Sequence, residues 1–140
     1  MAAPDPQKLR RQFRLPAEDE AFLDGLGLLW EAVIVAEQRW VLVYGEKIPD
    51  GYNYPLVDVA IIMAPGYPPA PLDMAYFYPP LIRADRVVPR LSEGRVNIDG
   101  KAWQGWSRHR TAKNPWLPGE DNLESHYFYM RAWLVDELKR

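Results

Sequence analysis

The segment Ser107-Arg108-His109-Arg110 places a hydroxyl, an imidazole and two guanidinium groups side by side in the chain. Transfer of an acyl group needs a nucleophile, a base that takes its proton, and donors that stabilise the oxyanion. Ser107 and His109 supply the first two types. Residues two apart in an extended segment point to the same side. We therefore predict Ser107 and His109 as a catalytic pair.

Charged residues around this pair widen what it could do. Asp99 or Asp121 could orient the imidazole, as the acid of a catalytic triad does. Arg108 or Arg110 could bind a carboxylate through paired N–H donors. Two other interpretations stay open. Hydrogen bonds from the serine and the histidine could fasten a long loop in place, or the segment could bind a partner without any chemistry.

Three tryptophans lie in the same part of the chain, at Trp103, Trp106 and Trp116. So much aromatic surface indicates a packed segment, in which the indoles belong to the core. The alternative is an exposed aromatic patch for a partner, because tryptophan and arginine are enriched in binding hot spots. The candidate binding residues are Trp103, Trp106, Arg108, Arg110 and Asp121.

The second histidine, His126, is predicted to cap or pack near the start of the last helix. His109 and His126 could form half of a metal site, but no His-Glu-x-x-His spacing accompanies them. We therefore predict no metal and no cofactor. Asp58 is expected on the solvent face of its strand, and Asp73 at the start of the last strand, neither with a partner for acid–base work.

The composition limits the classes of function. The chain has 140 residues, a net charge of -2 and no cysteine. One ordinary domain has this length. The near-neutral charge gives no argument for nucleic acid, and no apolar run approaches the roughly 20 residues of a membrane span. Without cysteine there is no disulfide framework, and the first residues lack the pattern of a signal peptide. We expect a cytoplasmic protein that binds neither nucleic acid nor membrane.

The elements that must position these residues follow a simple order. A polar basic arm spans 1–14 and could dock an acidic partner or simply be solvated. A domain over 15–140 follows, beginning with a short helix at about 16–24 and Pro16 in its first turn. Alternating apolar residues then predict an antiparallel meander of four strands, with Gln38-Arg39 as a tight turn. These strands are predicted at 30–37, 40–45, 55–63 and 73–78.

The second half of the chain is predicted as a long ordered flap and a helix. Residues 79–120 are rich in proline and glycine and show no clear periodicity. The helix at about 122–139 is capped by Asp121 with Glu124, and it carries one apolar stripe that covers the meander. The fold class is therefore α+β. The stripe consists of Leu123, Tyr127, Met130, Leu134 and Leu138.

Several short motifs resemble those of the ubiquitin-conjugating-enzyme (UBC) superfamily. Tyr67-Pro68-Pro69 lies between the third and fourth strands, Tyr78-Pro79-Pro80 follows the fourth, and Asn114–Pro118 precedes the closing helix. Leu72-Asp73-Met74 and the segment from Asp99 through Arg110 resemble the prokaryotic ubiquitin-conjugating-like family E. The resemblance covers about residues 15–138 and implies a UBC-like fold.

The same resemblance implies a pathway and two departures from it. The resemblance implies that the gene lies in a bacterial operon. Such operons also encode an activating-enzyme-like protein, a ubiquitin-like or multi-ubiquitin protein and a metallopeptidase. In a conjugating enzyme the thioester cysteine follows a Gly-x-x step. Counted in this way from Gly100, the position of the cysteine is occupied by Trp103. Trp103 is expected beside a groove at the start of the last helix. The asparagine of the His-Pro-Asn tripeptide is replaced by Pro80 or Leu81.

These departures lead to three hypotheses of function. In the first, a cysteine-less conjugating-enzyme-like protein binds the ubiquitin-like modifier or its activating enzyme. In the second, an active acyl carrier uses Ser107 and His109. In the third, the chain is a structural or assembly module with no role in conjugation.

Overall fold

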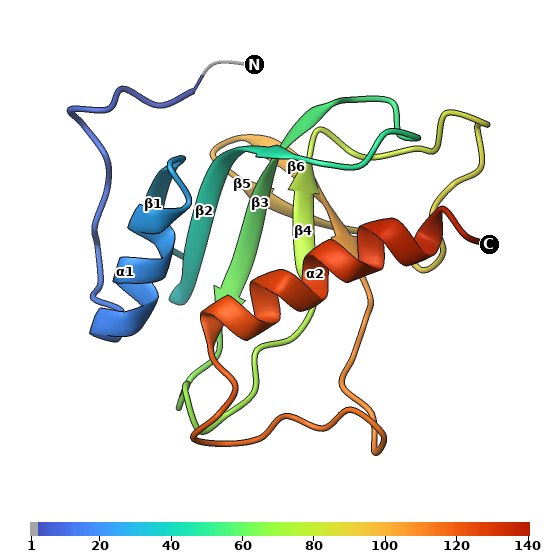
Figure 1. Cartoon of the computed structure of the whole chain (residues 1–140). Helices are drawn as coiled ribbons and strands as arrows, with labels where there is room; N and C mark the ends of the chain where they lie inside the picture. Colours follow the sequence, from blue (N-terminus) through green and yellow to red (C-terminus); the bar gives the residue numbers. More distant parts are fainter. Residues whose placement is uncertain (1–2) are drawn as a thin grey trace.

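Local sequence sets where most elements begin and end in the computed structural model, which describes residues 3–140. The first two residues of the predicted basic arm lie outside this range. Figure 1 shows the order of elements, a helix followed by six strands and a second helix. They are α1 (Ala17–Gly25), β1 (Leu29–Val35), β2 (Gln38–Lys47), β3 (Leu56–Met63), β4 (Ala75–Tyr78), β5 (Gly94–Ile98), β6 (Lys101–Trp106) and α2 (Leu123–Glu137).

The sheet has six antiparallel strands in the order β1-β2-β3-β4-β6-β5. The predicted four-strand meander is therefore present but incomplete. The added hairpin, β5 and β6, lies within the region that we predicted to be an irregular flap. Asp99 and Gly100 form its turn with φ angles of 55° and 74°. An Asp-Gly pair between alternating apolar residues is a strong hairpin signal, and it was missed among the surrounding prolines and glycines.

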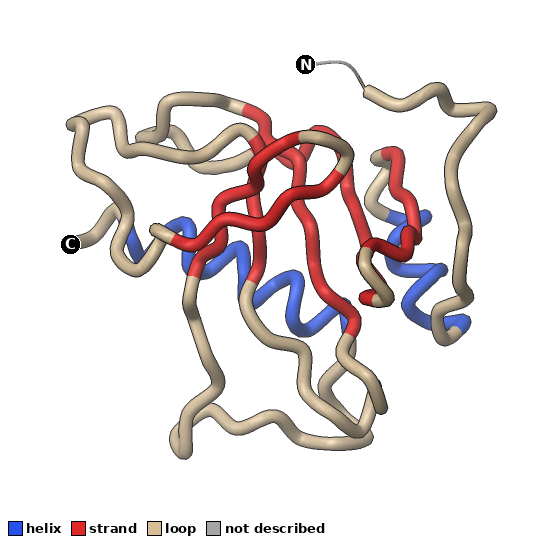
Figure 2. The backbone as a smooth tube through the Cα atoms, turned by 180° about the vertical axis from the view of Figure 1, so that it is seen from behind, coloured by secondary structure: helices blue, strands red, loops and turns tan. Residues whose placement is uncertain are grey.

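The hairpin curls across the back of the sheet, on the side opposite α2 (Figure 2). Its side chains Ile98 and Trp103 pack there with Trp40 and Leu42 of β2 in a small second core. Gly105 lies where β6 approaches Tyr76, and a Cβ atom at this position would come within 2.8 Å of the ring. The glycine therefore permits the close strand pairing that folds the hairpin over the sheet.

The main core lies between the other face of the sheet and α2 (Figure 1). Four of the five predicted stripe residues are buried and Leu138 packs against this core, so the predicted cover is confirmed. The predicted N-cap is off by one residue. Asn122, not Asp121, caps α2, and Ser125 rather than Glu124 completes the capping box.

Most described residues of the basic arm are exposed, but Arg10 fastens the arm to the domain. Arg10 donates to Glu31 on β1 at 2.7 Å and to Asp99 in the hairpin turn at 2.7 Å. Its backbone carbonyl also accepts from the N–H of Ala32 at 3.0 Å. The guanidinium thus joins the N-terminal segment, the first strand and the last hairpin, and it is not free to dock an acidic partner.

Two smaller predictions about β2 and β3 are also wrong. The β1–β2 turn consists of Ala36 and Glu37, both with positive φ, while Gln38 already belongs to β2. Asp58 is buried rather than solvent-facing, because its Oδ1 accepts a 3.0 Å hydrogen bond from the N–H of Gly45 at a register shift of β2. Burial raises the pKa of Asp58.

Candidate functional site

A cavity of about 470 Å³ lies between the segment that follows β6 and the C-terminal half of α2. This size falls within the usual range of ligand pockets. It collects the predicted residues Ser107, Arg108 and His109 with side chains distant in sequence. The other lining residues are Arg90, Leu91, Thr111, Tyr129, Trp133, Asp136, Glu137 and Arg140.

Glu137 organises the cationic side of this pocket. Its side chain is 1% exposed and accepts from Arg108 at 3.3 Å and from Arg140 at 2.7 Å. The N–H of Arg90 also donates to it at 3.1 Å, and Arg83 lies at 3.4 Å. Burial alone would raise the pKa of Glu137, but these hydrogen bonds hold it below its ordinary value. One ionised carboxylate therefore gathers several guanidinium groups at the pocket.

His109 has an acidic partner, but not one of those predicted. Its Nδ1 lies 2.7 Å from Oδ1 of Asp73, which precedes β4 by two residues. Asp99 is bound to Arg10 instead, and Asp121 to Arg110. Both members of the His109–Asp73 pair are more than half exposed. Within residues 3–140, the contact holds one ring nitrogen, and the other forms no hydrogen bond.

Ser107 lies beside this pair without a direct bond to it. Its N–H donates to the carbonyl of Leu91 at 2.9 Å, which ties the segment to the loop before β5. Within residues 3–140, no hydrogen bond joins the Ser107 hydroxyl to the His109 ring. The structure thus brings the predicted nucleophile and base to one pocket but does not show them engaged.

The two predicted binding tryptophans of β6 are core residues. Trp103 is 1% exposed and Trp106 is 0% exposed. Three residues apart on a strand, they point to opposite faces. Trp106 packs under α2, whereas the indole of Trp103 packs on the opposite face and donates to the carbonyl of Ile98 at 3.2 Å. The expected place of Trp103, beside a groove at the start of α2, is therefore wrong.

Arg110 and Asp121 hold the loop between β6 and α2. Asp121 accepts from Arg110 at 3.4 Å and from the N–H of Leu117 at 2.7 Å. The guanidinium of Arg110 also lies 5.3 Å from the ring of Trp116 and 4.8 Å from that of Tyr129. Such stacking stabilises an arginine that is largely covered. These contacts hold the loop in place, through side chains of the loop itself and through Tyr129 of α2.

His126 packs in the core, as predicted. It is 1% exposed, and its Nε2 lies 2.7 Å from the carbonyl oxygen of Met74. Burial lowers the pKa of His126 because the charged imidazolium would lose its hydration. Among residues 3–140, no group of three or more histidine, aspartate or glutamate side chains is arranged to hold a metal ion.

The roles of two residues, one bonded to His109 and one lining the pocket, were not predicted from the sequence. Asp73 was assigned to a strand end without a partner, and only the approach of the β3–β4 loop to His109 reveals its role. Glu137 looked like an ordinary polar residue near the end of a helix. Glu137 lies about one helical turn from both Trp133 and Arg140 in the sequence. This spacing indicates that its side chain can contact both residues. Nothing local to the sequence indicated that Arg83 and Arg108 converge on it.

Along the chain, a short N-terminal helix precedes an antiparallel sheet, and a C-terminal helix covers one face of that sheet. This order fits the conjugating-enzyme-like class that the sequence resembles, and the chain has no cysteine to form a thioester. The family model described as prokaryotic E2 family E matches residues 15–137, and the chain belongs to that family. No curated protein and no solved structure gave a significant match. Neither helix in the described range has the length and apolar character needed to cross a bilayer.

Proposed function

We propose that this protein acts in a ubiquitin-like conjugation pathway without forming a thioester itself, by binding the ubiquitin-like modifier or its activating enzyme. The observation that carries this proposal is the family match over residues 15–137 in a chain without cysteine. Thioester transfer requires a thiolate. A conjugating-enzyme-like protein without one keeps the capacity for recognition.

The pocket beneath Ser107 and His109 supports a binding role. Arg90, Arg108 and Arg140 line it together with the partly exposed ring of Tyr129. Guanidinium groups bind carboxylates through directed N–H donors, and aromatic groups supply contact area at little entropic cost. We propose that this surface receives an acidic or C-terminal segment of the partner.

Calorimetric titration with the cognate modifier and with its activating enzyme tests the proposal. We expect binding to at least one of them, weakened about tenfold or more by Arg90→Glu, since a reversed charge repels an acidic segment. Arg86→Gln is the matched control, because Arg86 is exposed and does not line the pocket. Absence of binding to both proteins would contradict the proposal.

A second candidate function is favoured by the His109–Asp73 contact. A carboxylate that holds one ring nitrogen leaves the other available as a base. Ser107 would attack the activated carbonyl of the modifier, its proton would pass to His109, and the leaving group would depart with that proton. The product is an oxyester on Ser107.

Incubation with the activating enzyme, ATP and the modifier separates the two functions. An oxyester adduct withstands thiol reducing agents and breaks in hydroxide, and mass spectrometry would place it on Ser107. If Ser107→Ala still formed the adduct, this residue would not be the nucleophile. Binding without any adduct leaves the first proposal as the function. The assembly-module hypothesis predicts neither.

A further inference from the structure

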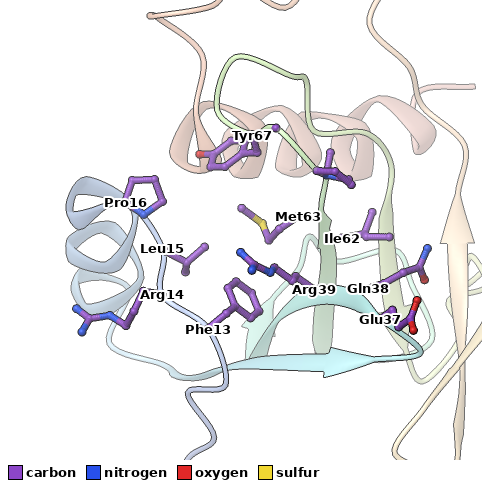
Figure 3. Close-up of a pocket in the computed structure, with 13 residues that line it drawn as sticks. Phe13, Arg14, Leu15, Pro16, Glu37, Gln38, Arg39, Ile62, Met63 and Tyr67 are labelled. Atoms are coloured by element: carbon purple, nitrogen blue, oxygen red, sulfur yellow. The ribbon is translucent and has the colours of Figure 1, made fainter.

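A second cavity, of about 440 Å³, lies at the other end of the sheet, between the segment before α1, the β1–β2 turn and the loop after β3 (Figure 3). It shares no lining residue with the pocket of Ser107 and His109, so a ligand bound here would serve a role beyond the proposed function. Its lining is mixed. The apolar side chains include Phe13, Leu15, Pro16, Ile62, Met63 and Tyr67, and the polar ones are Arg14, Glu37, Gln38 and Arg39.

Arg39 is one of the charged side chains that line this cavity. Arg39 pairs with Met63 across β2 and β3, on the face whose next inward residues, Val41 and Val43, belong to the main core. In Figure 3 its side chain lies between Phe13 and Met63. The guanidinium lies 5.4 Å from the Phe13 ring. Within residues 3–140, it forms no ion pair and no hydrogen bond.

Arg39 is exposed, so its charge is in contact with water while its guanidinium lies against the Phe13 ring. Arg14 also lines the cavity, but its guanidinium pairs with Glu20 at 3.0 Å. The Tyr67 hydroxyl is engaged as well, because it donates to Asp19 at 2.6 Å and accepts from the N–H of Leu123 at 2.7 Å. In the described part of the chain, no acidic side chain pairs with Arg39.

We propose that this cavity binds a small molecule with an apolar body and a single carboxylate, which pairs with Arg39. A planar guanidinium binds a carboxylate through two parallel N–H donors. The walls formed by Leu15, Ile62 and Met63 enclose the apolar body. Glu37 also lines the cavity and would repel a second negative charge, so a monocarboxylate fits better than a dicarboxylate.

A pair of probes of the same shape tests the role of charge. 3-Phenylpropionate carries the carboxylate, and 3-phenylpropanol replaces it with a neutral hydroxyl. We expect the acid to bind with a Kd of roughly 1 mM, about tenfold tighter than the alcohol. The measurement is an NMR titration that follows the Met63 methyl signal, since Met63 lines the cavity. Phenylsuccinate, with two carboxylates, should bind more weakly than the monoacid.

Two variants assign the effect to one side chain. Arg39→Gln keeps a long polar side chain at an exposed position and should remove the preference for the acid. Arg14→Gln is the matched control and should keep it, because Arg14 faces Glu20. Thermal unfolding of both variants checks that they fold.

The aliphatic part of an arginine side chain can also lie on apolar residues while the guanidinium stays in water, with no ligand involved. In that case the acid and the alcohol would bind equally or not at all, or Arg39→Gln would leave the preference intact. Any of these results, or binding that leaves the Met63 signal unmoved, would overturn the proposal.

Discussion

Two buried glutamates, Glu31 on β1 and Glu137 at the end of α2, both bind arginine, but their networks differ in kind. Glu31 accepts from the backbone N–H and the guanidinium of Arg10 and from the hydroxyl of Tyr44, at distances between 2.6 and 2.9 Å. Glu137 accepts from several arginines, mostly at 3.0 Å or more. The first network is closed and the second opens onto a pocket.

The difference shows that glutamate–arginine ion pairs can either fix the fold or organise a charged surface. Arg10 fastens three separate segments through Glu31 and Asp99, and its charge is fully used. At Glu137 the arginines outnumber the carboxylate, so positive charge remains toward the pocket. A buried carboxylate with one arginine fixes the fold. The same group with several arginines organises a surface that a partner can contact.

Removal of Arg10 should have the largest effect. Arg10→Ala leaves Glu31 buried without its main partner, and we expect a loss of about 3 kcal/mol in the free energy of unfolding. Urea denaturation measures it. Arg14→Ala is the matched control, since the Arg14 side chain is 84% exposed in its pair with Glu20 and its loss should change stability far less. Equal losses in the two variants would break the comparison.

Neutralising the other glutamate should cost less. Glu137→Gln removes the charge at the centre of the arginine cluster but keeps a hydrogen-bonding side chain of the same shape. Because the arginines reach solvent at the pocket, we expect a loss of about 1–2 kcal/mol in the same denaturation experiment. A loss larger than that of Arg10→Ala would mean that the arginine cluster at Glu137 stabilises the fold more than the Glu31 network does.

Acid should weaken the closed network in a defined window. Burial alone would raise the pKa of Glu31, but hydrogen bonds from Arg10 and Tyr44 lower it from 4.5 to about 2. A lowered pKa in the folded state contributes stability that is present above the unfolded value and is lost as pH falls toward the folded value. Unfolding free energies measured between about pH 5 and pH 2.5 should fall less steeply in Glu31→Gln than in the native protein. Parallel curves would contradict this assignment.

The smallest effect on stability is expected at the candidate catalytic pair. His109 and Asp73 are exposed and Ser107 shows no side-chain bond, so Ser107→Ala and His109→Gln should each change the unfolding free energy by under about 0.5 kcal/mol. Thermal and urea unfolding measure this. A loss above about 1 kcal/mol would support the interpretation that these residues fasten the loop.

Much of the fold was predictable because local patterns specify it. The first four strands, the two helices and the apolar stripe of α2 follow from alternation, helical spacing and turn residues. The hairpin at Asp99-Gly100 carried a readable signal that we did not use. The presence of both Ser107 and His109 in one pocket was predicted, because both belong to one short segment. Their lack of a direct hydrogen bond was not predicted.

The sequence by itself determined the α+β class, the order of the two helices and the first four strands, and the absence of a thioester cysteine, because these depend on residue types and on neighbours within a few positions. Only the tertiary structure decided that Asp73 meets His109, that Arg10 joins Glu31 to Asp99, and that Trp103 lies in the core. Such contacts join residues tens of positions apart. Their geometry depends on how the sheet curls, which no local pattern specifies.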